Sequence, residues 1–469
     1  MSGLLCSAMV FCSVPVFAAQ GTGAPNPAEL PDVTVEYNGE AVEFTDAEPC
    51  IKNSRTYVPF RAVFEAMGAS SIEYDASSKT VTAVRDGATV KMQVGKSEIQ
   101  VTKDGKTTNQ KIDAATFIKN SRTYVPARFA AQALGCQVGW DSQLRTVVIW
   151  DGDKLMEGTK GQFSLMKKYM EYSDQLVKKY PAYTGSFDLD MTVQDGAQPL
   201  RLKGSYDMKG KVADMKSIVN SSVKLDLRDI EKYLKAQPDW NSESQKILSA
   251  LEDFNIDIVF DESKNIIYCS SSFLDDLMGF RDGTWFSLDL KKLLSDAGYD
   301  FTDILEMSGK DFDMEKYLNA LMDKVNVNDS VSAAATAEIV TVCKELLSDS
   351  AFKKAGNDYT AELNENDSKL GYDMNFKFIL KGDSAGNIIG YDLSIALKAE
   401  DLTISMKAGQ NGQNGTCSIS ADLPDMLQMV MDGTFRYVKS VSGTLREPSA
   451  DSHINDLNQL LQDPVLSEK

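Results

Sequence analysis

Apolar residues follow two different periods along the chain, and the change of period divides it. Between residues 51 and 150, apolar residues at helical spacing, such as Val63, Phe64 and Met67, alternate with short apolar strands. From Phe187 to Val193, apolar and polar residues alternate one by one. Helical spacing indicates an amphipathic helix, and strict alternation indicates a strand with one face in water. The pattern predicts an α+β chain, with a small mixed α/β region followed by a larger antiparallel-sheet domain.

The larger domain, residues 183–446, is expected to consist of long strands with inserted helices. A helical stripe over residues 155–180, ended by Pro181, is predicted to connect it to the first region, in a connecting segment 153–182. This order suits an open sheet curled over helices, a possible open half-barrel, followed by a loosely ordered or weakly helical polar tail at 447–469. The expected strands are Leu200–Met208, Ile256–Phe260, Asn265–Ser270, Trp285–Leu290, Tyr372–Leu380, Ile388–Leu397, Asp401–Ala408 and Thr416–Ala421. The expected helices are Ser242–Phe254, Met314–Val325 and Ser330–Leu347, with Ser242 and Ser330 as N-caps.

A nine-residue segment occurs twice without a change. Ile51–Pro59 (IKNSRTYVP) recurs as Ile118–Pro126, 67 residues further on. Each copy continues through a helix-like stretch to a glycine, an aromatic-Asp pair and a Thr-Val strand, so the repeats span about 51–84 and 118–150. The recurring residues are Arg55, Tyr57, Pro59, Arg61, Gly68 and Asp75 in the first copy, and Arg122, Tyr124, Pro126, Arg128, Gly135, Trp140 and Asp141 in the second.

The local conformation of each repeat unit follows from these residues. Pro59 and Pro126 have a fixed φ and no N–H, which suits the first turn of a helix. Gly68 and Gly135 are predicted to end these helices in the left-handed conformation. Asp104-Gly105 is expected to turn a hairpin between the two copies.

The repeated motif resembles the copper amine oxidase N-terminal-like domain, which is also called a stalk domain in envelope proteins of Gram-positive bacteria. Arg-Thr-Tyr-Val-Pro-x-Arg, a short helix ending in Gly, the aromatic-Asp pair and the Thr-Val strand carry the resemblance, which covers residues 32–152. It implies a fold and an extracellular setting. It does not imply copper chemistry, because in that family the domain is an appendage to the catalytic part.

The larger domain is similar, through Trp285–Leu290 (WFSLDL) and the order of its strands and helices, to the half-barrel of LolA/LppX-type envelope lipoproteins. That resemblance implies an apolar ligand held between sheet and helices. Neither Cys6 nor Cys12 stands in the sequence context of that family's lipid anchor.

The first residues are typical of an export signal. Residues 4–17 are apolar and uncharged, and cleavage is expected after Ala18, so residues 1–18 are interpreted as a signal peptide and 19–31 as a flexible linker. A buried N-terminal helix is the alternative. No later segment has the length of a membrane span. We therefore expect a secreted or cell-surface protein.

Charge and cysteine content narrow the possible partners. Residues 153–469 hold −17 of the formal net charge of −19, which disfavours binding to nucleic acid and makes acidity for solubility the simpler explanation. Five cysteines remain after signal cleavage, with no CxxC pair, so no disulfide framework is expected. A bridge between Cys50 and Cys136 is the alternative.

The sequence argues against most catalytic and cofactor chemistry. His453, in the tail, is the single histidine, which removes Ser-His-Asp and Cys-His catalysis and histidine-based metal sites. We expect no catalytic residue, cofactor or metal ligand. Asp188 and Asp190 are interpreted as a solvated strand face rather than a glycosidase pair, and Asp261–Asn265 as a hairpin turn. Asp311, Asp313 and Glu315 suit an acidic first helical turn better than a calcium loop, and Trp285 suits the core better than a pocket wall.

The arginines of the repeat allow two interpretations. They could contact anions or glycans, or they could be structural, with Arg61 and Arg128 paired to Asp75 and Asp141. The structural interpretation is favoured, because duplication preserves a scaffold more readily than an asymmetric active site. The function expected is a non-catalytic envelope protein whose stalk domain mediates attachment or protein contact and whose larger domain binds an apolar ligand or an envelope partner. A carboxylate-dependent hydrolase of an envelope polymer and a purely structural spacer are the alternatives.

Overall fold

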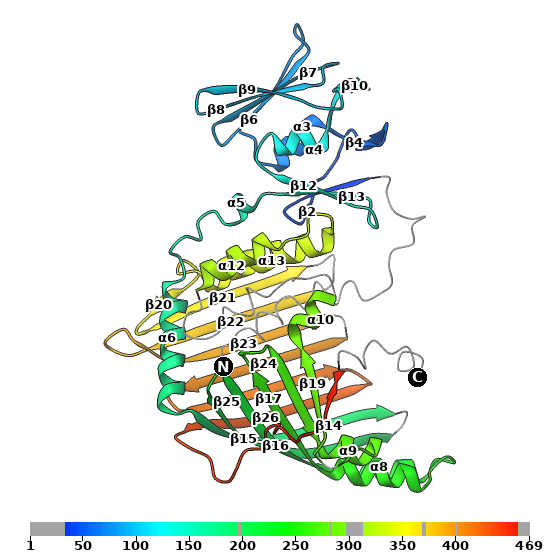
Figure 1. Ribbon diagram of the computed structural model, residues 1–469, viewed down its shortest axis with the longest axis vertical. Helices are drawn as coiled ribbons and strands as arrows, with labels where there is room; N and C mark the ends of the chain where they lie inside the picture. The colour runs from blue at the N-terminus through cyan, green and yellow to red at the C-terminus, as the bar shows by residue number, and fades with distance from the viewer. Residues whose placement is uncertain are drawn as a thin grey trace. The chain divides into compact units, whose positions relative to one another are not determined.

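The computed structural model describes residues 33–195, 198–281, 283–296, 313–367, 372–399 and 401–457. The predicted signal peptide and linker lie outside these residues, as do Asp311 and the end of the tail. The chain forms two compact units (Figure 1). The smaller unit contains the chain up to Lys160 together with Leu318–Cys343, and the larger unit contains Gly161–Tyr317 and the chain from Lys344 onward. Leu318–Cys343, which the sequence pattern assigned to the larger domain, thus groups with the smaller unit.

The smaller unit contains three small sheets and the two repeats. One sheet has the order β12 (Gln137–Asp141), β13 (Thr146–Trp150), β1 (Thr34–Tyr37), β2 (Glu40–Ala41). A second has the order β10 (Phe117–Lys119), β11 (Arg122–Pro126), β4 (Arg55–Pro59), β3 (Cys50–Lys52). The third has the order β5 (Ser71–Asp75), β6 (Thr80–Arg85), β7 (Ala88–Gln93), β8 (Glu98–Lys103), β9 (Lys106–Lys111).

The predicted helices of the repeats are confirmed as α3 (Phe60–Ala66) and α4 (Ala127–Gln132). Pro59 and Pro126 end the preceding strands and directly precede the helices, so they lie just outside the predicted first turn. Gly68 and Gly135 have φ of +75° and +89°, which confirms the left-handed helix ends. Apolar residues of both helices and of the paired strands form one shared core, so neither repeat has a core of its own.

Tight turns shape the hairpins of the smaller unit. Asn53 and Ser54 have φ of +51° and +57°, and their repeat equivalents Asn120 and Ser121 have +50° and +61°. Two successive positive φ angles define a type I′ turn, which matches the twist of a two-stranded hairpin. Asp104-Gly105, with φ of +51° and +74°, forms the predicted turn between β8 and β9.

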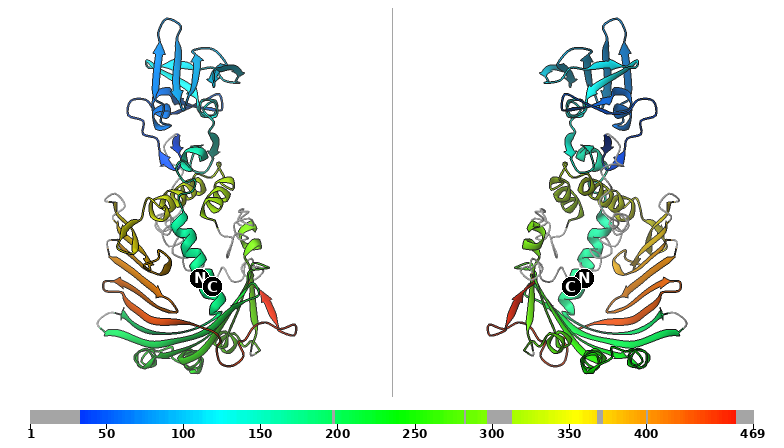
Figure 2. Two further views of the ribbon diagram at one scale, coloured as in Figure 1. Left: turned by 90° about the vertical axis from the view of Figure 1, so that its left-hand side faces the viewer. Right: turned by 90° about the vertical axis from the view of Figure 1, so that its right-hand side faces the viewer.

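The larger unit is built on a single 14-stranded sheet. Neighbouring strands are antiparallel except for the parallel pair formed by the last two strands. Figure 2 shows the sheet curled into an open trough, which confirms the half-barrel-like expectation. The order is β20 (Lys353–Ala355), β21 (Asp358–Asp367), β22 (Tyr372–Gly382), β23 (Ile388–Ala399), β24 (Leu402–Asn411), β25 (Asn414–Leu423), β26 (Leu427–Val438), β14 (Ala182–Asp195), β15 (Gln198–Ala213), β16 (Lys216–Asp226), β17 (Asp253–Asp261), β18 (Ile266–Ser271), β19 (Trp285–Asp289), β27 (Ile454–Asp456).

Every expected strand is present, but the sequence pattern missed several others. β16 places Asn220 and Ser221 side by side in buried positions and so lacks clean alternation. β26 does alternate between exposed and less exposed residues along its length, so its pattern was a usable signal that the sequence analysis overlooked. The tail was expected to be loosely ordered, and this was wrong for its first part. β27 pairs with β19, and the N–H of Trp285 donates to the carbonyl of His453 at 2.9 Å.

The remaining helices are α5 (Gly152–Leu155), α6 (Ser164–Lys179), α7 (Arg228–Lys235), α8 (Ser242–Glu252), α9 (Ser272–Met278), α10 (Leu290–Asp296), α12 (Met314–Asp323) and α13 (Ser330–Leu347). The connecting helix α6 begins later than expected, because Gly158 and Gly161 take positive φ. The predicted N-caps were wrong by one residue. Asn241 caps α8, and Asp329 accepts from the N–H of Ser332 at the start of α13.

Candidate functional site

The two identical nonapeptides lie side by side in one sheet. β4 pairs antiparallel with β11, with Val58 opposite Val125 and Tyr57 opposite Pro126. Val58 and Val125 are equivalent positions of the repeat, so the two copies are related by a local two-fold axis between these residues. The duplicated motif therefore forms the interface between the copies.

The repeated tyrosines belong to this interface. The ring of Phe117 lies edge-on to Tyr57 at 4.9 Å and stacks on Tyr124 at 5.2 Å, measured between centroids. Both tyrosines are buried, and burial raises the pKa of each phenol. The Tyr124 hydroxyl donates to the carbonyl of Glu48 at 3.0 Å. Their packing supports a structural role for both side chains.

Two arginines of the motif form reciprocal ion pairs between the copies. Arg55 pairs with Asp113 at 2.5 Å, and Arg122 pairs with Asp46 at 2.6 Å. Asp46 and Asp113 are also 67 residues apart, so the pairs are equivalent. The hydrogen bond from Arg55 is the main cause that lowers the pKa of Asp113. The sequence analysis missed these acids, although their spacing and shared Asp-Ala sequence were a usable signal.

The expected pairing of Arg61 with Asp75 was wrong. Arg61 lies 3.6 Å from Glu65, one turn further along α3. Asp75 accepts hydrogen bonds from the hydroxyls of Ser77 and Ser78 and from their backbone N–H groups, which lower its pKa to about 2. The acid therefore closes its own turn and needs no arginine.

The expected pairing of Arg128 with Asp141 was also wrong. Asp141 Oδ1 accepts from the N–H groups of Gln143 and Leu144 in its turn. Its Oδ2 accepts from the N–H and the hydroxyl of Ser330, at 3.1 and 2.9 Å, at the start of α13. Burial raises the pKa of Asp141, but these hydrogen bonds outweigh it and leave a lowered pKa. Asp141 thus attaches a distant helix to the second repeat.

Two clefts lie at equivalent positions of the two copies, and each is lined by residues of both copies. The first-copy cleft has a volume of about 850 Å³ and lies between α3, β5 and the second hairpin; its lining includes Phe60, Arg61, Tyr74, Ile118 and Arg122. The second-copy cleft has about 390 Å³ and lies between α4, β12 and the first hairpin; its lining includes Ala127, Arg128, Trp140, Ile51 and Arg55. Each cleft thus combines an exposed isoleucine, an aromatic ring and two arginines, a composition suited to polypeptide contact.

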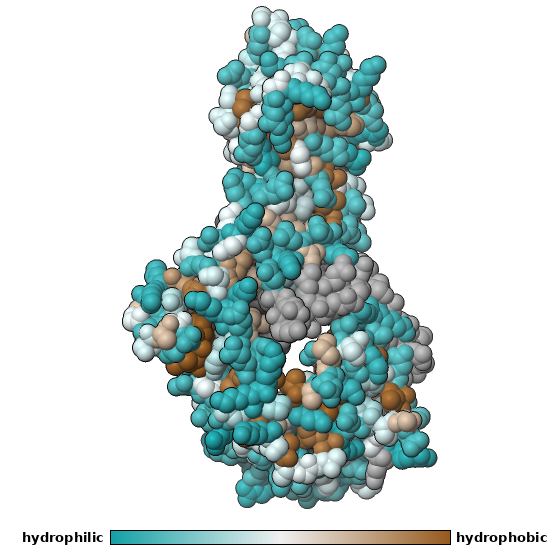
Figure 3. All heavy atoms as spheres, turned by 60° about the vertical axis from the view of Figure 1, so that its left-hand side comes forward, coloured by the Kyte–Doolittle hydropathy of each residue, from teal (hydrophilic) through white to brown (hydrophobic). Residues whose placement is uncertain are grey.

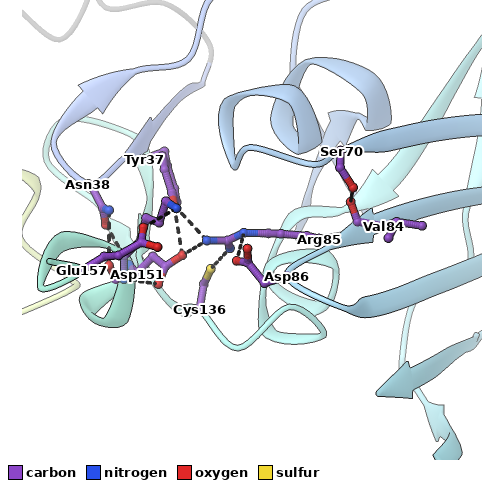
Figure 4. Close-up of polar contacts among 10 residues, drawn as sticks. Tyr37, Asn38, Ser70, Val84, Arg85, Asp86, Cys136, Asp151 and Glu157 are labelled. Carbon is purple, nitrogen blue, oxygen red and sulfur yellow. Dashed lines mark hydrogen bonds and ion pairs between the residues drawn. The ribbon is translucent and has the colours of Figure 1, made fainter. Parts of the chain in front are cut away.

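A buried polar cluster joins the first and last strands of the smaller unit (Figure 4). Arg85, 4% exposed, forms an ion pair with Asp151 and donates to the Tyr37 hydroxyl at 3.2 Å and to Cys136 Sγ at 3.4 Å. Tyr37 also donates to Asp151 at 3.0 Å. Burial is the largest influence on every member: it raises the pKa of Tyr37, and it raises that of Cys136 to about 11. A thiol with that pKa is protonated and unreactive, so the cluster is structural.

One face of the large sheet is lined by apolar side chains, and the other is lined by polar and charged ones. Residues paired across neighbouring strands share a face. One such row, from β22 to β14, is Phe376, Ile395, Met406, Ile419, Met431 and Leu189, and the next is Met374, Leu397, Ile404, Ala421, Met429 and Met191. A row on the opposite face is Lys377, Ser394, Lys407, Ser418, Asp432 and Asp188.

The apolar face is covered by helices only in part. α6 packs against one end of the strands, where Tyr169 contacts Phe378 and Tyr391 edge-on. α7 and α8 pack near Leu202 at the other end of β15. The middle of the first apolar row, from Ile395 to Met431, is partly exposed. Figure 3 shows apolar side chains at the floor of a hollow in the larger unit.

The other candidate residues lie in structural settings. Trp285 is 3% exposed in a core cluster with Ile218 and Val259, as the core interpretation predicted. Asp188 and Asp190 are exposed, which agrees with a solvated strand face. Asp261–Asn265 forms the predicted turn between β17 and β18.

Asp313 and Glu315 lie at the start of α12. Asp313 accepts from the N–H of Lys316, and Glu315 accepts from the N–H of Gly161. Within the described ranges, no group of three or more His, Cys, Asp or Glu side chains could hold a metal ion. The five cysteines outside the predicted signal peptide are free thiols. Among the residues that the structure describes, no helix combines the length and apolar character needed to cross a membrane.

Comparison with known proteins identifies the smaller unit. Residues 36–149 match the family described as the copper amine oxidase N-terminal domain, which confirms the resemblance seen in the repeats. The match covers about a quarter of the chain, so it applies to that region only. No curated protein matches the chain.

Two solved structures share little with the chain. A DUF1329 family protein from Desulfovibrio piger ATCC 29098 is 8% identical, over 60% of this chain and 95% of that one, with a TM-score of 0.20. An N-terminal dehydratase from the difficidin assembly line is 8% identical, over 59% and 84% of the two chains, with a TM-score of 0.07. Neither score is high enough to carry an argument about fold or function.

Proposed function

We propose that this protein is a non-catalytic binding protein, secreted or at the cell surface, whose larger unit holds an apolar ligand on the inner face of its sheet. The observation that carries the proposal is the partly exposed middle of the apolar row, Ile395, Met406, Ile419 and Met431. Apolar surface left in contact with water forgoes roughly 25 cal/mol per Å² of burial, and an apolar ligand recovers part of that.

The chemistry of this row favours a flexible ligand. Met406 and Met431 lie in the row, and Met429 and Met191 lie in the next. Methionine adapts to irregular shapes because it has three rotatable bonds and a polarizable sulfur. We therefore propose a molecule with an acyl chain as the ligand, and the copper amine oxidase N-terminal domain as the part that contacts envelope proteins.

Two experiments test the ligand. Native mass spectrometry of the protein purified from its own host should show bound mass that dissociates as a lipid. Binding of a dansyl-labelled undecanoic acid should weaken at least about tenfold when Met406→Trp and Met431→Trp fill the apolar row, because the larger rings occupy the space without adding charge. Ser418→Trp is the matched control, since it adds the same ring to the opposite face of β25 and should leave binding unchanged.

The outcomes separate the proposed function from its alternatives. A bare mass, together with no binding of the labelled acid, would favour a structural spacer. Cleavage of purified envelope polymer by the full chain would favour a carboxylate-dependent hydrolase. Equal weakening by Ser418→Trp would mean that the acid binds elsewhere.

A further inference from the structure

The equivalent strand edges β5 and β12 of the two repeats differ in what lies beside them. Both end their sheets, and both flank a cleft of the smaller unit. The segment before α13 lies against β12: the N–H of Trp140 donates to Asn328 Oδ1 at 3.3 Å. Gly139 makes this approach possible, because a Cβ there would lie 1.6 Å from the carbonyl oxygen of Val327. One edge of the pair therefore binds a polypeptide segment within this chain.

No described segment pairs with the outer edge of β5. Tyr74 is the equivalent of Trp140, and both strands have the same register with their inner neighbour, Tyr74 opposite Val81 and Trp140 opposite Val147. The N–H of Tyr74 is therefore directed away from β6, as that of Trp140 is directed away from β13. Tyr74 is 44% exposed beside the larger of the two clefts. An exposed edge of this kind is a template for pairing with another strand.

We propose that the β5 edge and the first-copy cleft bind an extended, basic polypeptide segment of a partner protein by strand addition. Strand addition takes its affinity from backbone hydrogen bonds and its specificity from alternate side chains. Here Phe60, Ile72 and Ile118 offer an apolar wall to every second side chain of such a segment.

The net negative charge of the first-copy cleft favours a basic partner. Its lining contains four acids, Glu43, Asp46, Glu65 and Glu73, and two arginines, Arg61 and Arg122. Both arginines pair with acids of the cleft, Asp46 and Glu65, which leaves Glu43 and Glu73 to attract a cation. A second copy of this chain is disfavoured, because its formal net charge is −19. Val327 approaches β12 closely because Gly139 has no side chain. The first copy has Glu73 at the equivalent position, so a segment bound to β5 must lie further away, at the distance of a paired strand.

The test uses the full chain and two synthetic peptides, acetyl-Lys-Val-Lys-Val-Lys-Val-Lys-amide and its counterpart with Glu in place of Lys. Titration calorimetry should show binding of the basic peptide and none of the acidic one. Hydrogen exchange at the Tyr74 amide should slow when the basic peptide is bound. Glu73→Lys should weaken binding at least about tenfold, whereas the same charge change at Glu98, an exposed residue of β8 outside the cleft, should not.

Tyr74→Pro tests the backbone contact directly. Proline is tolerated at an edge position whose N–H faces outward, so the variant should fold, as its circular dichroism melt will report. It should lose peptide binding, whereas Tyr74→Ala, which keeps the N–H, should retain most of it. Binding that survives both Glu73→Lys and Tyr74→Pro would overturn the proposal. The proposal would also be overturned if neither peptide bound to the full chain. Self-association of the chain that Tyr74→Pro abolishes would overturn it too, because the partner would then be a second copy.

Discussion

The two copies of the repeat share nine identical residues and have different surroundings. In the first copy, Asp75 hydrogen-bonds within its own turn, and β5 is an exposed edge. In the second copy, Asp141 holds the start of α13 through Ser330, and Trp140 contacts the preceding segment. Identical motif residues therefore build the same local fold, while the residues around them decide what each copy attaches.

Two differences in sequence explain this divergence. Ser78, whose hydroxyl donates to Asp75 Oδ2, is replaced by Leu144 in the second copy, so Asp141 Oδ2 is left for Ser330. Glu73 is replaced by Gly139, which admits the carbonyl of Val327. The second copy thus differs from the first by a lost hydroxyl and a removed side chain at the two points where α13 and the segment before it are in contact.

Removing the ion pair between Arg85 and Asp151 should have the largest effect on the stability of the smaller unit. Arg85, the last residue of β6, and Asp151, which directly follows β13, occupy equivalent positions of the two copies and pair with each other. Asp151→Ala leaves the buried guanidinium of Arg85 with the exposed carboxylate of Asp86, 3.3 Å from its Nε, as its remaining ion-pair partner. The loss of the buried carboxylate should lower the free energy of unfolding by about 3 kcal/mol. Urea unfolding of the full chain, followed by hydrogen exchange in β6 and β13, measures it. The exchanged pair Arg85→Asp with Asp151→Arg should recover part of the loss, and Lys91→Ala, at an exposed position of β7, is the control. Full wild-type stability in the double variant Arg85→Ala with Asp151→Ala would show that the pair does not stabilise the unit.

The same pair gives the smaller unit a pH dependence. Burial raises the pKa of Asp151, but the hydrogen bonds from Arg85 and from the N–H of Lys154 outweigh it, so the folded-state pKa is lowered. A lowered pKa means that the carboxylate stabilises the fold above its unfolded pKa of about 3.9 and that this stability is lost as the pH falls through the folded-state value. Asp151→Asn should therefore flatten the fall of stability below about pH 4, a slope that acid titrations of both proteins compare.

Removing the carboxylate of Asp141, which holds the start of α13, should have the next largest effect on stability. Asp141→Ala leaves the buried N–H and hydroxyl of Ser330 without an acceptor, at a cost of about 2–3 kcal/mol. Asp75→Ala removes a solvent-exposed turn acceptor and should cost less. Hydrogen exchange over Ser330–Cys343 should quicken in the first variant alone. Equal destabilisation by both variants would contradict the difference between the copies.

The sequence predicted what is local and missed what is distant. The repeat, the glycine helix ends and the alternation of β14 all depend on neighbours a few residues away. The partner of Asp141 lies 189 residues further along the chain, and no short-range pattern points to it. β16 was missed because Asn220 and Ser221 lie in buried positions and break the alternation on which strand prediction depends.

The candidate sites, too, could be predicted from the sequence only where they depend on local pattern or on the spacing of the repeat. The alternation of Ile419 with Ser418 and Ser420 predicts one apolar and one polar face of β25, but only the pairing of strands joins such residues into rows. The equal spacing of Asp46 and Asp113 could have predicted the reciprocal ion pairs. The wrong pairing of Arg61 with Asp75 came from joining neighbours in one copy, whereas the arginines of the motif pair across the local two-fold axis.

Valine at the two helix-ending glycines should have similar, intermediate effects. Gly68 and Gly135 both have positive φ, and a Cβ at either would meet no atom within 4 Å. The cost of Gly68→Val or Gly135→Val is therefore backbone strain alone, about 1–2 kcal/mol for each, rather than a steric clash. Thermal melts of the full chain should show the two variants within error of each other. A much larger effect in the second copy would mean that the docked α13 adds strain there.

The reciprocal ion pairs should have the smallest effect and the most symmetric one. Arg55 and Arg122 are about half exposed and pair with acids that are also about half exposed, so water and salt screen both pairs. Arg55→Gln and Arg122→Gln should each lower the melting temperature slightly in low salt. The difference from the unmodified chain should shrink in 0.5 M salt, where the screening length falls to about 4 Å. If Arg55→Gln alone were destabilising, and remained so in high salt, then Arg55 would act through packing against the second copy, and the two clefts would not be equivalent in their energetics.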